Sequence, residues 1–316
     1  MWRYPALLLA LVAPSLPSDV AGYLGARRAP SDDLLGRWDI TVETPEGKRP
    51  SWLEVRKSGN KMLVGQFVGI VGSARPVSRI DVTGDSLRFA IPPQWEEESA
   101  DLVVSGRVEG DRLRGSMTAP DGRRFDWTGV RAPLLRRAAK PAWGQPTRLI
   151  QPSGLAGWRA LGAENQWVVE NGVLRSPKSG ANLVTERSFG DFKLHVEFRY
   201  PKGSNSGVYL RGRHEVQIED SEAESLSSEQ FSGVYGFIAP SENAARKAGE
   251  WQAYDITLVG RKVTVVANGK TVICDREIPG ITGGALDSNE GEPGPLMLQG
   301  DHGPIEYRNI RITPAQ

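Results

Sequence analysis

The fold is decided by the stretch Asn205-Ser-Gly-Val-Tyr-Leu-Arg-Gly-Arg-His-Glu-Val-Gln-Ile-Glu-Asp-Ser221. Apolar and polar residues alternate along it in steps of two, as in half-buried β-strands, with an interruption at Gly212-Arg213. The stretch predicts a hairpin with an apolar face made of Val208, Leu210, Val216 and Ile218. The opposite face would carry Tyr209, Arg211, Glu215, Gln217 and Glu219. Side chains of these types bind and ionise sugars or oxyacids, so this face is the first indication of function.

The composition is that of a globular, strand-rich protein. The 316 residues predict roughly two domains of about 150 residues each. Thirty-six glycines and 22 prolines suit many turns between many strands. The formal net charge of +1 gives no reason to expect nucleic acid or an acidic membrane surface as a partner.

The N-terminal residues are typical of an export signal. Arg3 precedes an apolar run over residues 6–13, which is too short to span a bilayer. We predict a signal peptide over residues 1–26 and an extracytoplasmic protein, periplasmic or secreted, with no integral membrane segment after cleavage. A buried N-terminal strand or an uncleaved anchor is the alternative.

Residues 31–133 form a first unit of short strands joined by hairpin-type turns, such as Lys57-Ser-Gly-Asn60 and Glu109-Gly-Asp111. Consecutive hairpins close most economically as an antiparallel β-barrel, so we predict a barrel-like accessory domain. Trp95 precedes three glutamates, a pattern that we interpret as a solvated acidic loop, with a loop over the mouth of the barrel as the alternative. Residues 134–148 combine proline, alanine and basic residues and are predicted to be a linker.

Residues 149–316 predict a second all-β domain. Phe192–Tyr200 alternates almost without a break, and Asn268-Gly269 joins two further strands as a hairpin turn. Gly233–Ile238 is expected to be another strand. About twelve short strands with polar loops favour a two-sheet antiparallel sandwich of jelly-roll type, similar to the concanavalin-like and laminin-G-like folds.

Four motifs in this domain carry a more specific resemblance. They are Asn205-Ser-Gly-Val-Tyr-Leu-Arg-Gly, Glu215-Val-Gln-Ile-Glu-Asp, Gly233-Val-Tyr-Gly and Leu298-Gln-Gly-Asp-His-Gly303. Their order resembles that of the 3-keto-disaccharide hydrolase domain family, over residues 149–313. The resemblance implies an enzyme, a hydrolase or lyase, that acts on 3-keto-glycosides. Gly300 departs from the family pattern, in which Gln-Asp-His-Gly is expected without a break, and this puts the direction of His302 in question.

Ordinary glycoside hydrolysis is disfavoured by spacing. Glu215 and Glu219 would share a strand face with Cα atoms roughly 13 Å apart. Glycosidases need carboxyl groups about 5 to 9.5 Å apart. Gln217 occupies the middle acid position of a glucanase-type strand and cannot ionise. A conventional glucanase therefore remains only as an alternative, for which long side chains or a bulge would have to narrow the gap.

A 3-keto sugar asks for different groups, because its carbonyl makes the C2 proton acidic. One base can remove that proton, and a donor near the C3 oxygen stabilises the enolate. Glu215 or His302 is the expected base, and Arg211 the expected enolate stabiliser. The residues expected to bind the carbohydrate substrate are Asn205, Tyr209, Gln217, Tyr235 and Gln299.

The cofactor requirement is not fixed by these residues. A divalent metal ion would suit an enolate, and His214, Asp220 and Asp301 are candidate ligands, although none has a recognised ligand spacing. A second hypothesis uses the same polar face without catalysis, as a lectin-like carbohydrate-binding sandwich.

Overall fold

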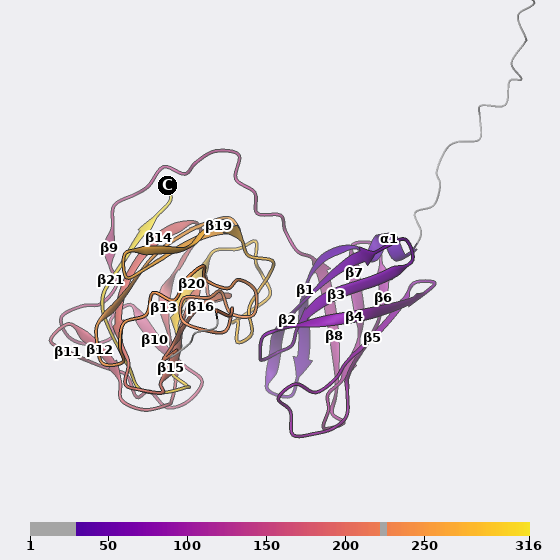
Figure 1. Ribbon diagram of the computed structural model, residues 1–316, viewed down its shortest axis with the longest axis horizontal. Helices are drawn as coiled ribbons and strands as arrows, with labels where there is room; N and C mark the ends of the chain where they lie inside the picture. Colours follow the sequence, from indigo (N-terminus) through magenta and orange to yellow (C-terminus); the bar gives the residue numbers. More distant parts are fainter. Residues whose placement is uncertain (1–29, 222–225) are drawn as a thin grey trace, which may run out of the picture.

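A computed structural model describes residues 30–221 and 226–316 of the chain. The predicted signal peptide lies outside the described residues, and within them no helix is long and apolar enough to cross a membrane. The chain folds into a β-barrel and a β-sandwich, joined by a segment that arches over the sandwich (Figure 1). The prediction of an all-β protein with a barrel followed by a jelly-roll sandwich is confirmed.

The barrel is a closed ring in which each strand pairs with the next and β8 returns to β1. After the short helix α1 (Pro30–Leu34), its strands are β1 (Gly36–Thr44), β2 (Gly47–Ser58), β3 (Met62–Val68), β4 (Ala74–Thr83), β5 (Ser86–Ile91), β6 (Leu102–Glu109), β7 (Arg112–Thr118) and β8 (Arg124–Arg131). Inward-facing side chains such as Trp38, Ile40, Phe67 and Trp127 fill its interior. The barrel is thus a packed core, as expected for eight strands.

The sandwich consists of two antiparallel sheets. The five-stranded sheet has the order β10 (Trp158–Leu161), β13 (Asn182–Phe189), β20 (Gly294–Leu298), β15 (Asn205–Leu210), β16 (His214–Glu219). The other sheet has the order β11 (Val168–Glu170), β12 (Val173–Ser176), β21 (Ile305–Pro314), β14 (Phe192–Arg199), β17 (Gln252–Val259), β18 (Lys262–Ala267), β19 (Lys270–Glu277), and β9 (Thr147–Arg148) also pairs with β21. The apolar inner faces of both sheets form one core between them.

The predicted hairpin is β15 and β16. Val208 pairs with Val216 and Ser206 with Ile218 on the face that packs in the core. The expectation of a strand over residues 233–238 is wrong, because this segment forms turns with isolated bridges from Val234 to Val216 and Ile238. Its backbone nevertheless covers the outer edge of β16, since the Gly233 carbonyl accepts from the backbone N–H of Gln217 and the backbone N–H of Tyr235 donates to the carbonyl of Glu215. The irregular segment 233–238 therefore protects the exposed edge of β16.

The barrel docks on the sandwich through the outer face of β1 and β2. Arg37 pairs with Glu277, and the Thr41 hydroxyl lies 2.8 Å from that of Ser288. Trp52 is fully buried at the centre of this interface. The barrel is therefore attached through a buried apolar contact with polar contacts beside it.

Candidate active site

On the polar face of the hairpin, the side chain of Glu215 on β16 lies across the neighbouring strand β15. Tyr209 pairs with Glu215 and Gly207 with Gln217, so the polar side chains lie on one face, as predicted. A Cβ atom at Gly207 would lie 2.1 Å from Oε1 of Glu215. The carboxyl group of Glu215 therefore occupies the space that any other residue at position 207 would fill.

Glu215 is buried, and among the described residues no arginine or lysine pairs with it. Only 3% of the residue is exposed. Its Oε2 lies 2.9 Å from the Tyr209 hydroxyl, and its backbone N–H donates to the Thr282 hydroxyl. Burial raises the pKa of Glu215 to about 8, the hydrogen bond from Tyr209 and the charge of His302 act against this rise, and the charge of Asp301 adds to it. A carboxyl group with this pKa exchanges its proton close to neutral pH.

The hydrogen bonds of Tyr209 fit both protonation states of Glu215. Its hydroxyl also lies 3.0 Å from the carbonyl oxygen of Gly283. A phenol has one proton and cannot donate fully to both acceptors. Both contacts are satisfied when Glu215 carries a proton and donates to the tyrosine oxygen, while Tyr209 donates to Gly283. When Glu215 is ionised, Tyr209 donates to its carboxylate instead, so the same phenol serves both protonation states of a carboxyl group that burial poises near neutral pH.

His302 reaches the same site from the loop after β20. Its Nδ1 lies 2.6 Å from Oδ1 of Asp301, and Oδ2 of Asp301 accepts from Asn182 at 3.3 Å. The hydrogen bond to Asp301 raises the pKa of His302, and the charges of Asp301 and Glu215 add to the rise. His302 and Glu215 therefore lie close enough for each charge to shift the pKa of the other. The side chain of His302 is about half exposed (53%), so it lies at the rim.

Two carboxamides of the site, those of Gln217 and Gln299, have unused acceptors. The Oε1 atoms of Gln217 and Gln299 are buried and have no hydrogen-bond partner among the described residues. Gln217 lies on the polar face of β16, and the backbone N–H of Gln299 donates to the carbonyl of Gly207. Buried polar atoms without partners call for an explanation, and sugar hydroxyls would supply the missing donors.

Tyr235 and Asn205 flank these groups. Burial and then the charge of Glu215 raise the pKa of Tyr235 to about 12, which places its phenol near that carboxyl group. Asn205 begins β15 opposite Glu219 and is partly exposed. The structure thus gathers Tyr209, Glu215, Gln217, Tyr235, Gln299 and His302, with Asn205 at the end of the same face.

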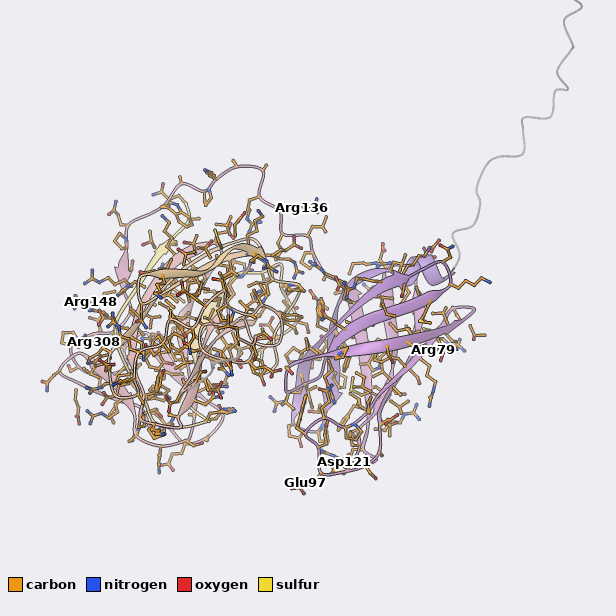
Figure 2. All side chains as sticks on the ribbon, viewed as in Figure 1. Arg79, Glu97, Asp121, Arg136, Arg148 and Arg308 are labelled. Atoms are coloured by element: carbon orange, nitrogen blue, oxygen red, sulfur yellow. The ribbon has the colours of Figure 1, made fainter. Side chains whose placement is uncertain are left out.

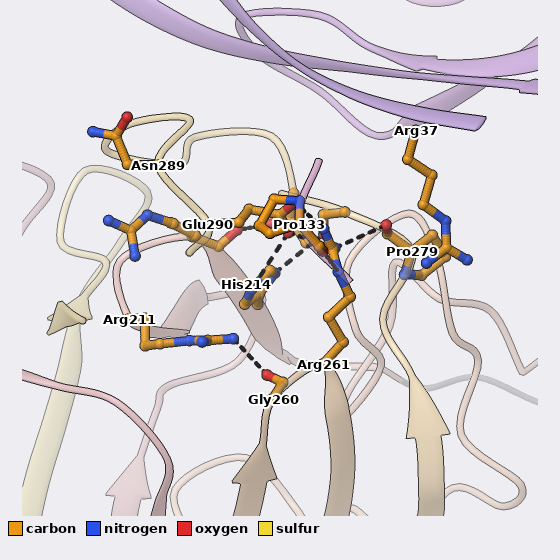
Figure 3. Close-up of polar contacts among 12 residues, drawn as sticks. Arg37, Pro133, Arg211, His214, Gly260, Arg261, Pro279, Asn289 and Glu290 are labelled. Carbon is orange, nitrogen blue, oxygen red and sulfur yellow. Dashed lines mark hydrogen bonds and ion pairs between the residues drawn. The ribbon is translucent and has the colours of Figure 1, made fainter. Parts of the chain in front are cut away.

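Arg211 is not brought to this site. β15 ends at Leu210, and Arg211 lies in the tight turn with φ of 54°, so the alternation of the strand does not continue through it. Its guanidinium donates to the carbonyl of Gly260 at 2.6 Å, and burial lowers its pKa to about 10. Figure 3 shows it beside His214, Arg261 and Glu290. The expectation that Arg211 would act beside Glu215 does not fit its position.

The candidate metal ligands also lie apart. His214 is fully buried in the ionic cluster of Figure 3, where its Nδ1 lies 3.1 Å from the carbonyl of Gly280. Asp220 accepts from the backbone N–H of Gly203 and fixes a turn, while Asp301 holds His302. Over residues 30–221 and 226–316, no group of three or more His, Cys, Asp or Glu side chains is arranged to hold a metal ion. The structure does not assemble the predicted ligand set.

The glucanase geometry is not formed either. β15 and β16 pair in unbroken register from Leu210–His214 to Asn205–Glu219, so no bulge brings Glu219 toward Glu215. Their Cα atoms remain roughly 13 Å apart along the strand. The Cα atoms of Glu215 and Glu219 are thus farther apart than the roughly 5 to 9.5 Å that separates the two carboxyl groups of a glycosidase.

Comparison with known proteins identifies the family. Residues 145–313 match the model of the 3-keto-alpha-glucoside-1,2-lyase-like domain, which is more than half of the chain. The chain belongs to this family. The predicted resemblance is therefore confirmed, and the protein is carbohydrate-active. The barrel lies outside the matched residues.

Solved structures similar to this lyase-like family member include a candidate glycosyl hydrolase from Parabacteroides distasonis. It is 28% identical, and the match covers 56% of this chain and 92% of that chain with a TM-score of 0.47. The carbohydrate binding module CBM66 from Bacillus subtilis is 9% identical over 49% of this chain and 94% of its own, with a TM-score of 0.35. A search of curated proteins found no match.

The sequence did not reveal the groups that support Glu215 and Asp301. Gly283 and Thr282 lie 67 or more residues away along the chain, and Asn182 comes from β13. None of them belongs to a recognisable motif. Only the Asn205-Ser-Gly pattern carried a signal, since Gly207 is the position across which the carboxyl group lies.

Proposed function

We propose that this family member cleaves 3-keto-glycosides by removing the C2 proton and expelling the substituent at C1. The observation that carries the proposal is Glu215, a carboxyl group that is 3% exposed, bonded to a tyrosine and raised in pKa to about 8 by burial. A carboxylate with such a pKa is a much stronger base than an ordinary glutamate, and it matches the task of removing a proton next to a carbonyl.

The proposed reaction proceeds in two steps. The Glu215 carboxylate takes the C2 proton, and the electrons of the C–H bond form the enolate of the C3 ketone. The ketone then re-forms, a C1–C2 double bond appears, and the C1–O bond breaks. The leaving oxygen takes a proton from His302, whose charged form is favoured by Asp301. Addition of water across the double bond would turn the elimination into net hydrolysis.

Binding of the sugar is assigned to polar side chains of the site. The unused acceptors of Gln217 and Gln299 would receive hydroxyl protons, and Tyr235 would donate near the ketone. Because Arg211 lies elsewhere, hydrogen-bond donors rather than a guanidinium would stabilise the enolate. The signal-like N-terminus leads us to place this reaction outside the cytoplasm.

The test is an assay of the purified protein on a 3-keto-disaccharide in deuterated water, with and without added divalent cations. We expect release of the leaving sugar and, in recovered substrate or hydrated product, deuterium at C2. Glu215→Gln should abolish both, since an amide cannot accept the proton. Wild-type protein that binds the sugar without turnover, and does so equally well as Glu215→Gln, would instead establish the lectin-like alternative.

A further inference from the structure

Two loops that contribute to the candidate site rest on the barrel. Tyr235 precedes Gly236, where a Cβ atom would lie 2.6 Å from the backbone nitrogen of Ala74. Gly283, which accepts the hydrogen bond from Tyr209, lies against Gly72 so closely that a Cβ atom would be 2.0 Å from the Gly72 carbonyl oxygen. The same short barrel segment therefore supports the site from two directions.

This contact is fixed by a buried apolar cluster. The ring of Trp52 meets that of Phe237 edge-on at 5.3 Å, and it also covers Gly280, where a Cβ atom would lie 2.2 Å from the indole. Ile281 and Val68 complete the cluster. Because such close-packed contacts cannot slide without losing van der Waals energy, the segment between β3 and β4 holds these two loops in place.

An exposed indole lies directly on that segment. Trp95 is 49% exposed, and its ring edge packs on Gly72, where a Cβ atom would be 2.3 Å away. The guanidinium of Arg75 lies 4.7 Å from its ring centroid and is itself fixed by a 2.7 Å ion pair with Glu96. Figure 2 marks this loop by Glu97, at the lower end of the barrel. The interpretation of this loop as merely solvated and acidic leaves the fixed indole unexplained.

We propose that Trp95 forms a subsite for the leaving group of the substrate, the sugar or other ring attached at C1. This inference rests on the proposed function. The contacts run from Glu215 to Tyr209, to Gly283, to Gly72 and to Trp95. In this proposal the keto ring lies over Glu215, and the second ring extends toward the barrel and lies against the exposed indole of Trp95.

The chemistry of the indole suits the leaving sugar better than the keto ring. The keto ring needs hydrogen bonds at nearly every oxygen, which the polar side chains of the candidate site provide. The leaving ring needs only to be held, and the C–H face of a pyranose packs well on an aromatic surface. An indole that is already immobilised loses little conformational entropy on binding. The barrel would thus select substrates by the group at C1.

The test compares two 3-keto-glucosides, a disaccharide and the methyl glycoside, which lacks a second ring. Trp95→Ala should raise KM for the disaccharide about tenfold with little change in kcat, and should leave the methyl glycoside unaffected. Trp95→Phe should recover part of the affinity. The matched control is Trp251→Ala, since Trp251 is also stacked by arginines. The guanidinium of Arg308 lies 3.9 Å from its ring centroid, and Figure 2 shows Arg308 on the side of the sandwich away from the barrel.

Each outcome has one meaning. Equal effects of Trp95→Ala on both substrates, or none on either, would overturn the subsite. Failure of the wild-type protein to cleave the methyl glycoside and the disaccharide would overturn the proposed function. In that case the affinity of the disaccharide for wild type and for Trp95→Ala, measured by calorimetry, still tests the subsite. The subsite predicts weaker binding by the variant, and equal affinities would overturn it.

Discussion

Two buried glutamates of the sandwich domain have opposite surroundings. Glu290 is fully buried, but both of its carboxylate oxygens accept from the guanidinium of Arg261, and His214 lies 3.8 Å away. Glu215 is almost as enclosed, but its carboxyl group contacts a tyrosine hydroxyl and, within the part of the chain that the structure describes, pairs with no arginine or lysine. A buried carboxylate with a bidentate arginine is committed to structure, whereas one without a cation exchanges its proton near neutral pH.

The structural carboxylate also explains the position of Arg211. Burial lowers the pKa of Arg211, the charge of Glu290 acts against this, and the charges of Arg213 and Arg261 add to it, so these groups form one cluster. Asp39 of the barrel also lies near Glu290, because burial and then the charge of Glu290 raise the pKa of Asp39. Arg261 in addition donates to the carbonyl of Pro133, at the end of the barrel. Charged groups at this end of the hairpin therefore contribute to the contact between the two domains, and they do not pair with Glu215.

The largest effect is expected from Gly207→Ala. The new methyl group would lie 2.1 Å from Oε1 of Glu215 and push the carboxyl group off its position, so turnover should fall on the order of 10³-fold. The fold should survive, because the displaced atoms are the end of a side chain. Gly190→Ala, which meets nothing within 4 Å, is the control. Full activity of Gly207→Ala would show that the position of Glu215 is irrelevant.

The next effect is expected in stability. Glu290→Gln leaves Arg261 buried without its counter-charge and should lower the free energy of unfolding by about 3 kcal/mol, measured by urea denaturation. The variant should keep most of its turnover at temperatures where it is folded. Glu215→Gln should show the reverse pattern, with its stability intact and its turnover lost. Identical behaviour of the two variants would remove the distinction between the two glutamates.

The smallest effect concerns the proton donor. Asp301→Asn removes the carboxylate that raises the pKa of His302, so His302 should lose its proton at lower pH. The alkaline fall of kcat/KM should then begin at lower pH, and kcat should drop about tenfold. Asp255→Asn is a matched control, because Asp255 holds the half-buried His195 in the same way at 2.8 Å. An unchanged pH profile for Asp301→Asn would exclude His302 as the donor.

The sequence predicted most of the fold because strand alternation and turn residues are local. The hairpin and its two faces followed from residues 205–219, and the pairing of Tyr209 with Glu215 follows from a turn of fixed length. The family motifs then brought His302 to the same site. Residues 233–238 were misassigned because their alternation is that of a strand, while the edge of β16 is satisfied by turns instead.

Other features depend on contacts between distant segments. Arg211 looked like a member of the polar face, but a positive φ and the carbonyl of Gly260 decide where its guanidinium lies. The hydroxyl of Tyr209 donates to the carbonyl oxygen of Gly283, which lies 74 residues away along the chain. The docking of the barrel on residues 236 and 283 needed the packed interface, because nothing in either segment alone indicates a partner.

The most direct measurement is an infrared titration of the Glu215 carboxyl group, taken as the difference between wild type and Glu215→Gln. Other buried acids such as Asp39 are present in both proteins and cancel. A protonated-carboxyl band that persists through neutral pH and disappears with a midpoint near 8 is expected, because burial raises the pKa of Glu215 to about 8. A band that is lost near the ordinary glutamate value of about 4.3 would contradict the account.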